Sequence, residues 1–135
     1  MTVVRAEQGR TVPWRNGLGT TRELARVPDS DDWHWRLSIA TSTGPAEFSS
    51  FPGVDRELLL LEGEALELRF ADGRTVGLGV GERVRFAGED AVVGVPVGGV
   101  THQVNLMWRR ELFSEVALDV VEAGAAFEVT MRPGV

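Results

Sequence analysis

The stretch from Arg56 to Leu78 reads RELLLLEGEALELRFADGRTVGL, and it decides the fold class that the sequence predicts. The four leucines at 58–61 form a continuous apolar run, which is typical of a buried strand. Beyond Gly63 the apolar residues alternate with Glu67 and Arg69, the period of a half-buried strand. The dipeptide at 72–73, Asp-Gly, favours a hairpin turn, and the alternation returns at 76, 78 and 80. The stretch therefore predicts consecutive antiparallel strands.

The same period of two extends in both directions. Residues 33–40 alternate between apolar and polar side chains, and further strands are expected at 84–86, 91–95, 104–107, 112–121 and 127–131. A short helix is an alternative at 119–126. The chain contains 16 glycines, and its turn signals recur every eight to twelve residues, so we predict an all-β barrel or sandwich.

Composition narrows the class of protein. A chain of 135 residues corresponds to one domain. Its net charge of −6 argues against nucleic-acid binding. No apolar run is long enough for a membrane span and the first residues have no signal-peptide core, so we expect a cytoplasmic protein. There is no cysteine and no lysine, which excludes thiolate chemistry and leaves anion recognition to arginine.

Residues 56–68 and 81–88 resemble the central strands of cupins, which are small double-sheet barrels that often hold a metal. Counting back from Gly63, the positions of the metal ligands in that pattern fall on Ser49, Phe51 and Arg56. None of these can ligate a metal, and an arginine would repel one. The only histidines are His34, expected at a strand rim, and His102, expected in a loop or at a strand edge. We therefore expect no metal and no cofactor.

Four motifs, in order, extend this resemblance to a family. They are WRNGLGTTREL at 14–24, WHWRLSIA at 33–40, GPAEFSSFPGVDR at 44–56, and NLM at 105–107 followed by two arginines at 109–110. The chain resembles the HutD/Ves family over roughly residues 3 to 110. Two features depart from the family pattern. Gln103 and Val104 stand where members usually carry Asp-Phe, and the C-terminal part is short.

The resemblance implies a single cupin-like domain over residues 1–135, all-β, with a bicupin (RmlC-like) double-stranded β-barrel or sandwich. Its second barrel would be abbreviated or completed by another subunit, as in a homodimer. The resemblance also implies a metal-free regulatory protein that binds a small anionic metabolite, such as N-formylglutamate in histidine utilisation.

Two arginines are the main candidates for binding a carboxylate. Arg36 is predicted on the strand face opposite Trp33, Trp35, Leu37 and Ile39, and a guanidinium in a cavity can hold a carboxylate through two parallel hydrogen bonds. The alternative is an exposed arginine paired with a neighbouring acid. Arg56 occupies the lost metal-ligand position, which faces inward in cupins. Arg109 and Arg110 are expected to be solvated.

Other candidate ligand contacts are polar residues with short side chains, namely Asn16, Thr20, Glu23 and Asn105. Asn16 and Thr20 could instead only satisfy a tight turn, and Asn105 could instead bond at a strand end. Gly17 and Gly19 permit positive φ or a close approach of the backbone, and Trp14 is expected to anchor the segment.

Three functions remain open from the sequence. The first is a binding protein that makes and breaks no bond. The second is a cupin-type enzyme, an isomerase or amidohydrolase, with Glu23 and His34 or His102 as acid and base. The third is a subunit whose strand edges drive assembly. The sequence offers no nucleophile motif, no metal-ligand set and no phosphate loop, which favours the first.

Overall fold

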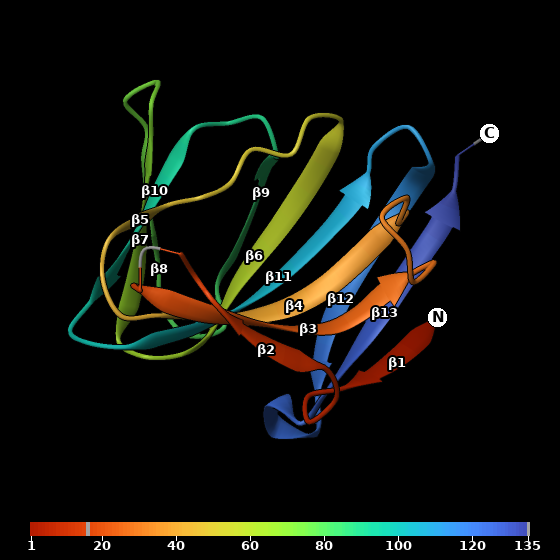
Figure 1. Cartoon of the computed structure of the whole chain (residues 1–135), viewed down its shortest axis with the longest axis horizontal. Helices are drawn as coiled ribbons and strands as arrows, with labels where there is room; N and C mark the ends of the chain where they lie inside the picture. Colours follow the sequence, from red (N-terminus) through yellow and green to blue (C-terminus); the bar gives the residue numbers. More distant parts are fainter. Residues whose placement is uncertain (16, 135) are drawn as a thin grey trace.

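The computed structural model describes residues 1–15 and 17–134, and strands make up most of them (Figure 1). The strands are β1 (Thr2–Arg5), β2 (Arg10–Pro13), β3 (Gly19–Val27), β4 (Trp35–Ser42), β5 (Ala46–Glu47), β6 (Val54–Glu62), β7 (Ala65–Phe70), β8 (Thr75–Leu78), β9 (Arg83–Ala87), β10 (Val92–Val97), β11 (Thr101–Arg109), β12 (Phe113–Val121) and β13 (Ala126–Pro133). The helix considered at 119–126 is only the short 3-10 turn η1 (Glu122–Gly124). No helix in the described part of the chain has the length and apolar character that crossing a bilayer would require.

The centre of the molecule is a six-stranded sheet in the order β2-β3-β4-β11-β6-β9. Its strands pair antiparallel. Successive side chains of a strand point to opposite faces, so β11 sends Val104 and Leu106 to one face and Asn105 and Met107 to the other. All four are buried, because another part of the molecule covers each face.

A three-stranded sheet, β1-β13-β12, covers one face of the central sheet (Figure 1). The core between the two sheets combines side chains of β3, β4, β6 and β11 with Val4, Leu118, Phe127 and Val129.

A buried carboxylate fastens these two sheets together. Glu57 in β6 is 2% exposed and accepts hydrogen bonds from Arg83 at 3.0 Å and Arg85 at 2.6 Å. The same two guanidinium groups donate to the backbone carbonyls of Leu118 and Val116 in β12, the edge strand of the three-stranded sheet. The arginines therefore bind two backbone carbonyls that lie two residues apart along that edge.

A four-stranded sheet, β5-β10-β7-β8, lies on the other side of the molecule (Figure 1). It packs on β6 and β9 through a second core: Leu58, Leu60, Leu66, Leu68, Phe70, Leu78, Phe86 and Val92. The hairpin predicted at 72–73 is present between β7 and β8, where Gly73 has φ of +98°. The all-β, cupin-like prediction is confirmed, and its sheets form a sandwich, not a closed barrel.

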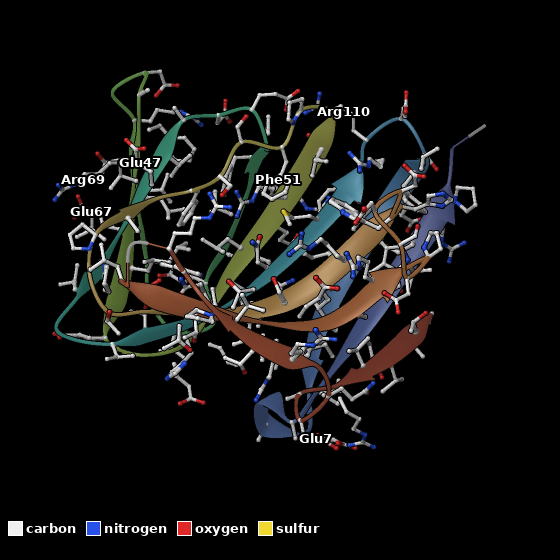
Figure 2. The ribbon with its side chains drawn as sticks, viewed as in Figure 1. Glu7, Glu47, Phe51, Glu67, Arg69 and Arg110 are labelled. Atoms are coloured by element: carbon white, nitrogen blue, oxygen red, sulfur yellow. The ribbon has the colours of Figure 1, made fainter. Side chains whose placement is uncertain are left out.

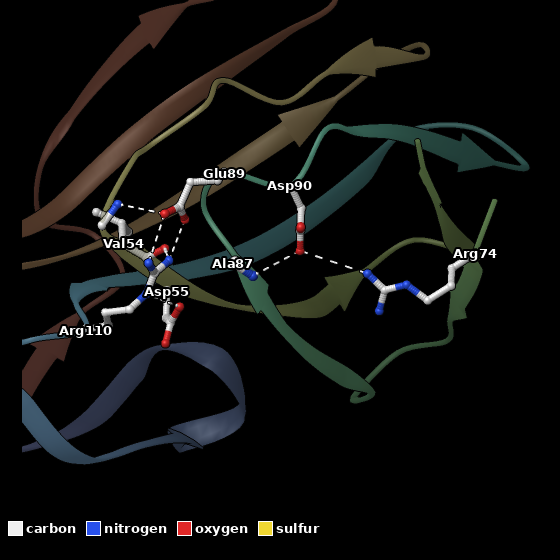
Figure 3. Close-up of polar contacts among 8 residues, drawn as sticks. Val54, Asp55, Arg74, Ala87, Glu89, Asp90 and Arg110 are labelled. Carbon is white, nitrogen blue, oxygen red and sulfur yellow. Dashed lines mark hydrogen bonds and ion pairs between the residues drawn. The ribbon is translucent and has the colours of Figure 1, made fainter. Parts of the chain in front are cut away.

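The segment from β5 to β6 is held by ion pairs at its far end (Figure 3). Glu89 accepts a hydrogen bond from the Gly53 amide at 3.0 Å and is paired with Arg110. Arg110 also donates to Asp55 at 3.0 Å and to the Val54 carbonyl at 3.1 Å. Both neighbours hold the pKa of Glu89 down to about 2, Arg110 contributing most. Arg110 is exposed, as the sequence predicts, and it is also the centre of these ion pairs.

Candidate functional site

A cavity of about 590 Å³ opens on the face of the central sheet that points away from the three-stranded sheet. Its floor comes from β3, β4, β11 and β6, and its walls come from β2, from residues 14–15 and from residues 47–51. Figure 2 shows Phe51 beneath the segment that runs from β5 to β6, with Glu47 towards one end of that segment and Arg110 towards the other. The ion pairs around Arg110 therefore hold one wall of the cavity in place.

Strand register arranges the floor in rows. Arg36 of β4 and Arg56 of β6 both pair with Met107 of β11, so one strand separates the two arginines. Two residues along each strand, the next row places Glu23, Ser38 and Asn105 side by side, followed by Leu58. The cavity therefore has a cationic row beside a row of hydrogen-bonding groups.

Arg56 is a buried cation with no acidic partner among the described residues. It is 5% exposed, and its one hydrogen bond goes to the Ser49 carbonyl at 3.5 Å. Its guanidinium carbon lies 5.1 to 5.8 Å from three aromatic ring centres, those of Phe48, Phe51 and Phe86. Burial, with a smaller contribution from Arg36, lowers its pKa to about 10. Buried charges in proteins are normally paired, so this cage is suited to an anion from outside the chain.

Arg36 is half-buried and only partly neutralised. Its terminal nitrogen lies 3.5 Å from Glu23, which is also paired with Arg26 at 3.0 Å. Its Nε is buried and has no hydrogen-bond partner in the described structure. Burial lowers the pKa of Arg36 and Arg26 adds to this, whereas Glu23 opposes it. Glu23 is thus shared between two arginines and neutralises Arg36 only in part.

The prediction that Arg36 faces away from Trp33 was wrong. Trp35, Leu37 and Ile39 do lie in the opposite core, but Trp33 packs with Met107 and Phe51, and its ring centre is 5.6 Å from the Arg36 guanidinium. The reason is that β4 begins only at Trp35, so strand alternation does not extend back to Trp33.

The amide side chains of β11 have different roles. Gln103 is 1% exposed and its amide is bonded to Ser42 at 2.7 Å and Thr101 at 3.0 Å. It therefore maintains the sheet and has little left for a ligand. Asn105 lines the cavity, and its Oδ1 has no partner among residues 1–15 and 17–134. Asn105 keeps hydrogen-bonding capacity beside the arginines.

The glycine-rich segment forms the rim of the cavity. Trp14 donates its indole N–H to the Thr21 hydroxyl at 2.8 Å, and a Cβ on Gly19 would lie 2.6 Å from the Trp14 ring and also strike the Thr41 carbonyl. Gly19 thus allows the predicted close approach, and Trp14 anchors the segment as expected. The strand β3 begins directly at Gly19. Asn16 lies outside the described residues.

The remaining candidates do not join this cavity. Thr20 and His102 line a second pocket on the opposite face of the sheet, where His102 bonds to Thr41 at 2.9 Å. His102 belongs to the central strand β11, not to a loop or a sheet edge. His34 is exposed, directly before β4. In the described ranges, no group of three His, Cys, Asp or Glu residues is placed to hold a metal ion.

Several lining residues were not predicted from the sequence, among them Ser38, Phe48 and Met107. Ser38 and Met107 could have been inferred, because each lies two residues from a candidate on the same strand, Arg36 and Asn105. Phe48 gives no such signal, since it belongs to the irregular segment after β5.

The three sheets have a cupin-like arrangement. The fold is similar to the cupin domain of an XRE-family transcriptional regulator from Enterobacter cloacae, with a TM-score of 0.57, 18% identity, and coverage of 67% of this chain and 96% of that one. At that identity the likeness concerns the fold alone.

Residues 6–132 match the HutD family model, and the chain belongs to the HutD family. It is 41% identical over 100 residues to Protein Ves of Citrobacter koseri, covering 73% of this chain and 52% of that protein. The structure of HutD from Pseudomonas fluorescens SBW25 is similar, with a TM-score of 0.79, 29% identity, and coverage of 87% and 65%. A conserved protein of unknown function from Pseudomonas aeruginosa PAO1 has the same TM-score of 0.79 at 30% identity, with coverage of 87% and 61%. The chain spans about half the length of the curated relatives it matches.

Proposed function

We propose that this chain is a regulatory binding protein for a small carboxylate metabolite, held in the cavity between Arg36 and Arg56. The observation that carries the proposal is the Arg56 guanidinium, which is 5% exposed, is surrounded by aromatic rings and has no acidic partner within the described chain. A carboxylate bound there would supply the missing counter-charge, and a hydrogen bond to a charged group contributes roughly 1.5–3 kcal/mol.

N-formylglutamate, an intermediate of histidine utilisation, is the first ligand to test, because the family resemblance suggests it. Its carboxylates match the two arginines of the cationic row, and its formamide offers a donor and an acceptor to the adjacent row that contains Ser38 and Asn105. The cavity of about 590 Å³ has room for a molecule of this size.

Binding without chemistry fits the composition of the cavity better than catalysis does. Glu23, the acid or base of the enzyme alternative, is paired with Arg36 and Arg26. Neither histidine of the chain lines this cavity. Among the described residues, the acid–base pair of the enzyme alternative, Glu23 with His34 or His102, is therefore not assembled around the proposed ligand position.

Thermal denaturation with a panel of carboxylates tests the proposal. We expect N-formylglutamate to raise the midpoint, and its uncharged diamide to have no effect. A ligand at a hundredfold excess over its Kd adds about 2.7 kcal/mol of stability. Arg36→Ala should abolish the shift, whereas Arg69→Ala, at an exposed residue of β7 far from the cavity lining, should keep it.

The ligand should also be recovered unchanged after incubation, as measured by proton NMR. Consumption of the ligand, with loss of turnover in Arg36→Ala, would support the enzyme alternative instead. A panel that produces no shift in the native chain, or the same shift in Arg36→Ala, would refute the proposed site.

A further inference from the structure

The second pocket lies on the other face of the central sheet, at the end where the three-stranded sheet no longer covers it. It measures about 300 Å³ and is lined mainly by polar side chains from β2, β3, β4, β11 and β6, with Ala6 and Gly124 at its border. None of its residues lines the larger cavity. The two spaces are therefore separated by the sheet itself.

Register places four polar residues of this pocket in one row. Thr20 pairs with Thr41, Thr41 pairs with His102, and His102 pairs with Glu62, each on a neighbouring strand. Next to this row, the centre of the same sheet face is apolar core, with Leu37, Val104 and Leu106 all fully buried. A polar row that interrupts an apolar face gives the pocket hydroxyl and imidazole groups that core packing does not require.

Arg22 supplies the positive charge of this second pocket. It lies on β3 two residues beyond Thr20, and its backbone pairs with that of Thr11. Its side chain is half-buried, and the Nε is buried with no hydrogen-bond partner in the described structure. No carboxylate of the described residues forms an ion pair with it. Among the described residues, Glu62 is the one acid that lines the pocket. It lies on β6, three strands away from β3, which corresponds to roughly 14 Å at about 4.8 Å per strand.

The hydrogen bond between Thr41 and His102, 2.9 Å long, leaves one donor free in either arrangement. If the imidazole Nδ1–H donates, the threonine hydroxyl hydrogen is free. If the hydroxyl donates, the neutral imidazole carries its hydrogen on Nε2. A guanidinium, further threonine hydroxyls and this extra donor make a group of donors suited to an oxyanion.

We propose that this pocket is a second anion site, in which Arg22 and the hydroxyls of Thr11, Thr20 and Thr41 bind a small oxyanion, a phosphate or a carboxylate. The site is independent of the function proposed above, because it shares no residue with the larger cavity. Sequence alternation along β3 separates the two sites: Thr20 and Arg22 face one, whereas Thr21 and Glu23 face the other.

The two histidines of the chain provide a direct readout. The whole chain is titrated at pH 8 and constant ionic strength, once with inorganic phosphate and once with acetate, while the imidazole C–H signals are followed by NMR. We expect His102 to shift in a saturable manner with at least one of the two anions, and exposed His34 to serve as the internal control. Saturation with phosphate alone assigns a phosphate group, and saturation with acetate alone assigns a carboxylate.

Arg22→Met should raise the Kd for the effective anion at least tenfold, with both histidine signals still dispersed as in a folded chain. Thr20→Val, which removes only one hydroxyl, should raise it severalfold and guards against a folding defect in the first variant. Arg56→Met should leave the His102 titration unchanged, so failure of the larger cavity cannot be mistaken for failure of this site. The proposal is overturned if neither anion shifts His102, or if Arg22→Met titrates like the native chain.

Discussion

Replacing Arg56 by methionine should stabilise the free protein while removing its ligand response. Folding takes this guanidinium out of water and lowers its pKa to about 10 from an ordinary 12.5. At 1.36 kcal/mol per pH unit, the buried charge costs about 3 kcal/mol near neutral pH. Replacing a buried charge with an apolar side chain of similar volume is often neutral or stabilising, because this desolvation cost disappears.

The substitution also removes favourable contacts. The guanidinium lies near three aromatic rings. Three cation–π contacts of about 0.5–1 kcal/mol each sum to about 1.5–3 kcal/mol, and contacts of the methionine sulfur with the rings recover about 1 kcal/mol of this. The net gain should therefore be about 1–2 kcal/mol. For a chain of 135 residues, the unfolding entropy converts 1 kcal/mol into about 3.5 °C, so we expect the melting temperature to rise by about 4–7 °C.

Differential scanning calorimetry without ligand measures this change, with Arg69→Met as the matched control at an exposed arginine. The control should stay within about 0.5 kcal/mol of the native chain. The stability difference between Arg56→Met and the native chain should shrink above pH 10, because the native arginine then releases its proton more readily folded than unfolded. The reasoning fails if the variant melts lower than the native chain, or if it still responds to carboxylates.

Three further outcomes are expected. Because the folded pKa of Glu89 is about 2, its pairing with Arg110 should stabilise the fold fully above pH 4.5, and this stabilisation should be lost as the pH falls towards 2. Acid titration followed by circular dichroism should therefore show a flatter dependence of stability on pH for Glu89→Gln than for the native chain. An identical curve would contradict this. Glu57→Gln should cost about 1–3 kcal/mol in urea denaturation, since it removes the negative charge and turns one of the two acceptor oxygens into an amide donor that faces a guanidinium. A loss under 0.5 kcal/mol would show that this ion-pair cluster is unimportant for stability. Gly19→Ala should cost about 1–3 kcal/mol through its clash with the Trp14 ring and should change tryptophan fluorescence, whereas Gly77→Ala, which meets open space, should change neither.

The alternation of apolar and polar residues predicted those strands that have one apolar face and one polar face. The hairpin of β7 and β8 and the long strand β6 follow directly from leucines that alternate or run together. β2 was not predicted, because all four of its residues are exposed and its Pro13 is unusual within a strand. An edge strand of this kind has no apolar period to recognise.

The same rule explains what was right and wrong at the site. Alternation places Arg36 on the face opposite Trp35, Leu37 and Ile39, whereas the inward position of Arg56 follows from the cupin resemblance. Thr20 and Glu23 were grouped as contacts of one ligand, but they are three residues apart on one strand and therefore face opposite sides. The neighbours His102 and Gln103 of β11 likewise face different cavities, as alternation along a strand requires.

Arg83 and Arg85 cover the free edge of β12, and this limits how a strand of another molecule can pair with that edge. A strand arriving from another molecule would need the carbonyls of Val116 and Leu118, which already accept hydrogen bonds. Displacing the two arginines would also strip Glu57 of its counter-ions while it remains enclosed in protein. Growth of the sheet into a fibre or a swapped dimer is therefore opposed at this border by electrostatics as well as by occupied acceptors.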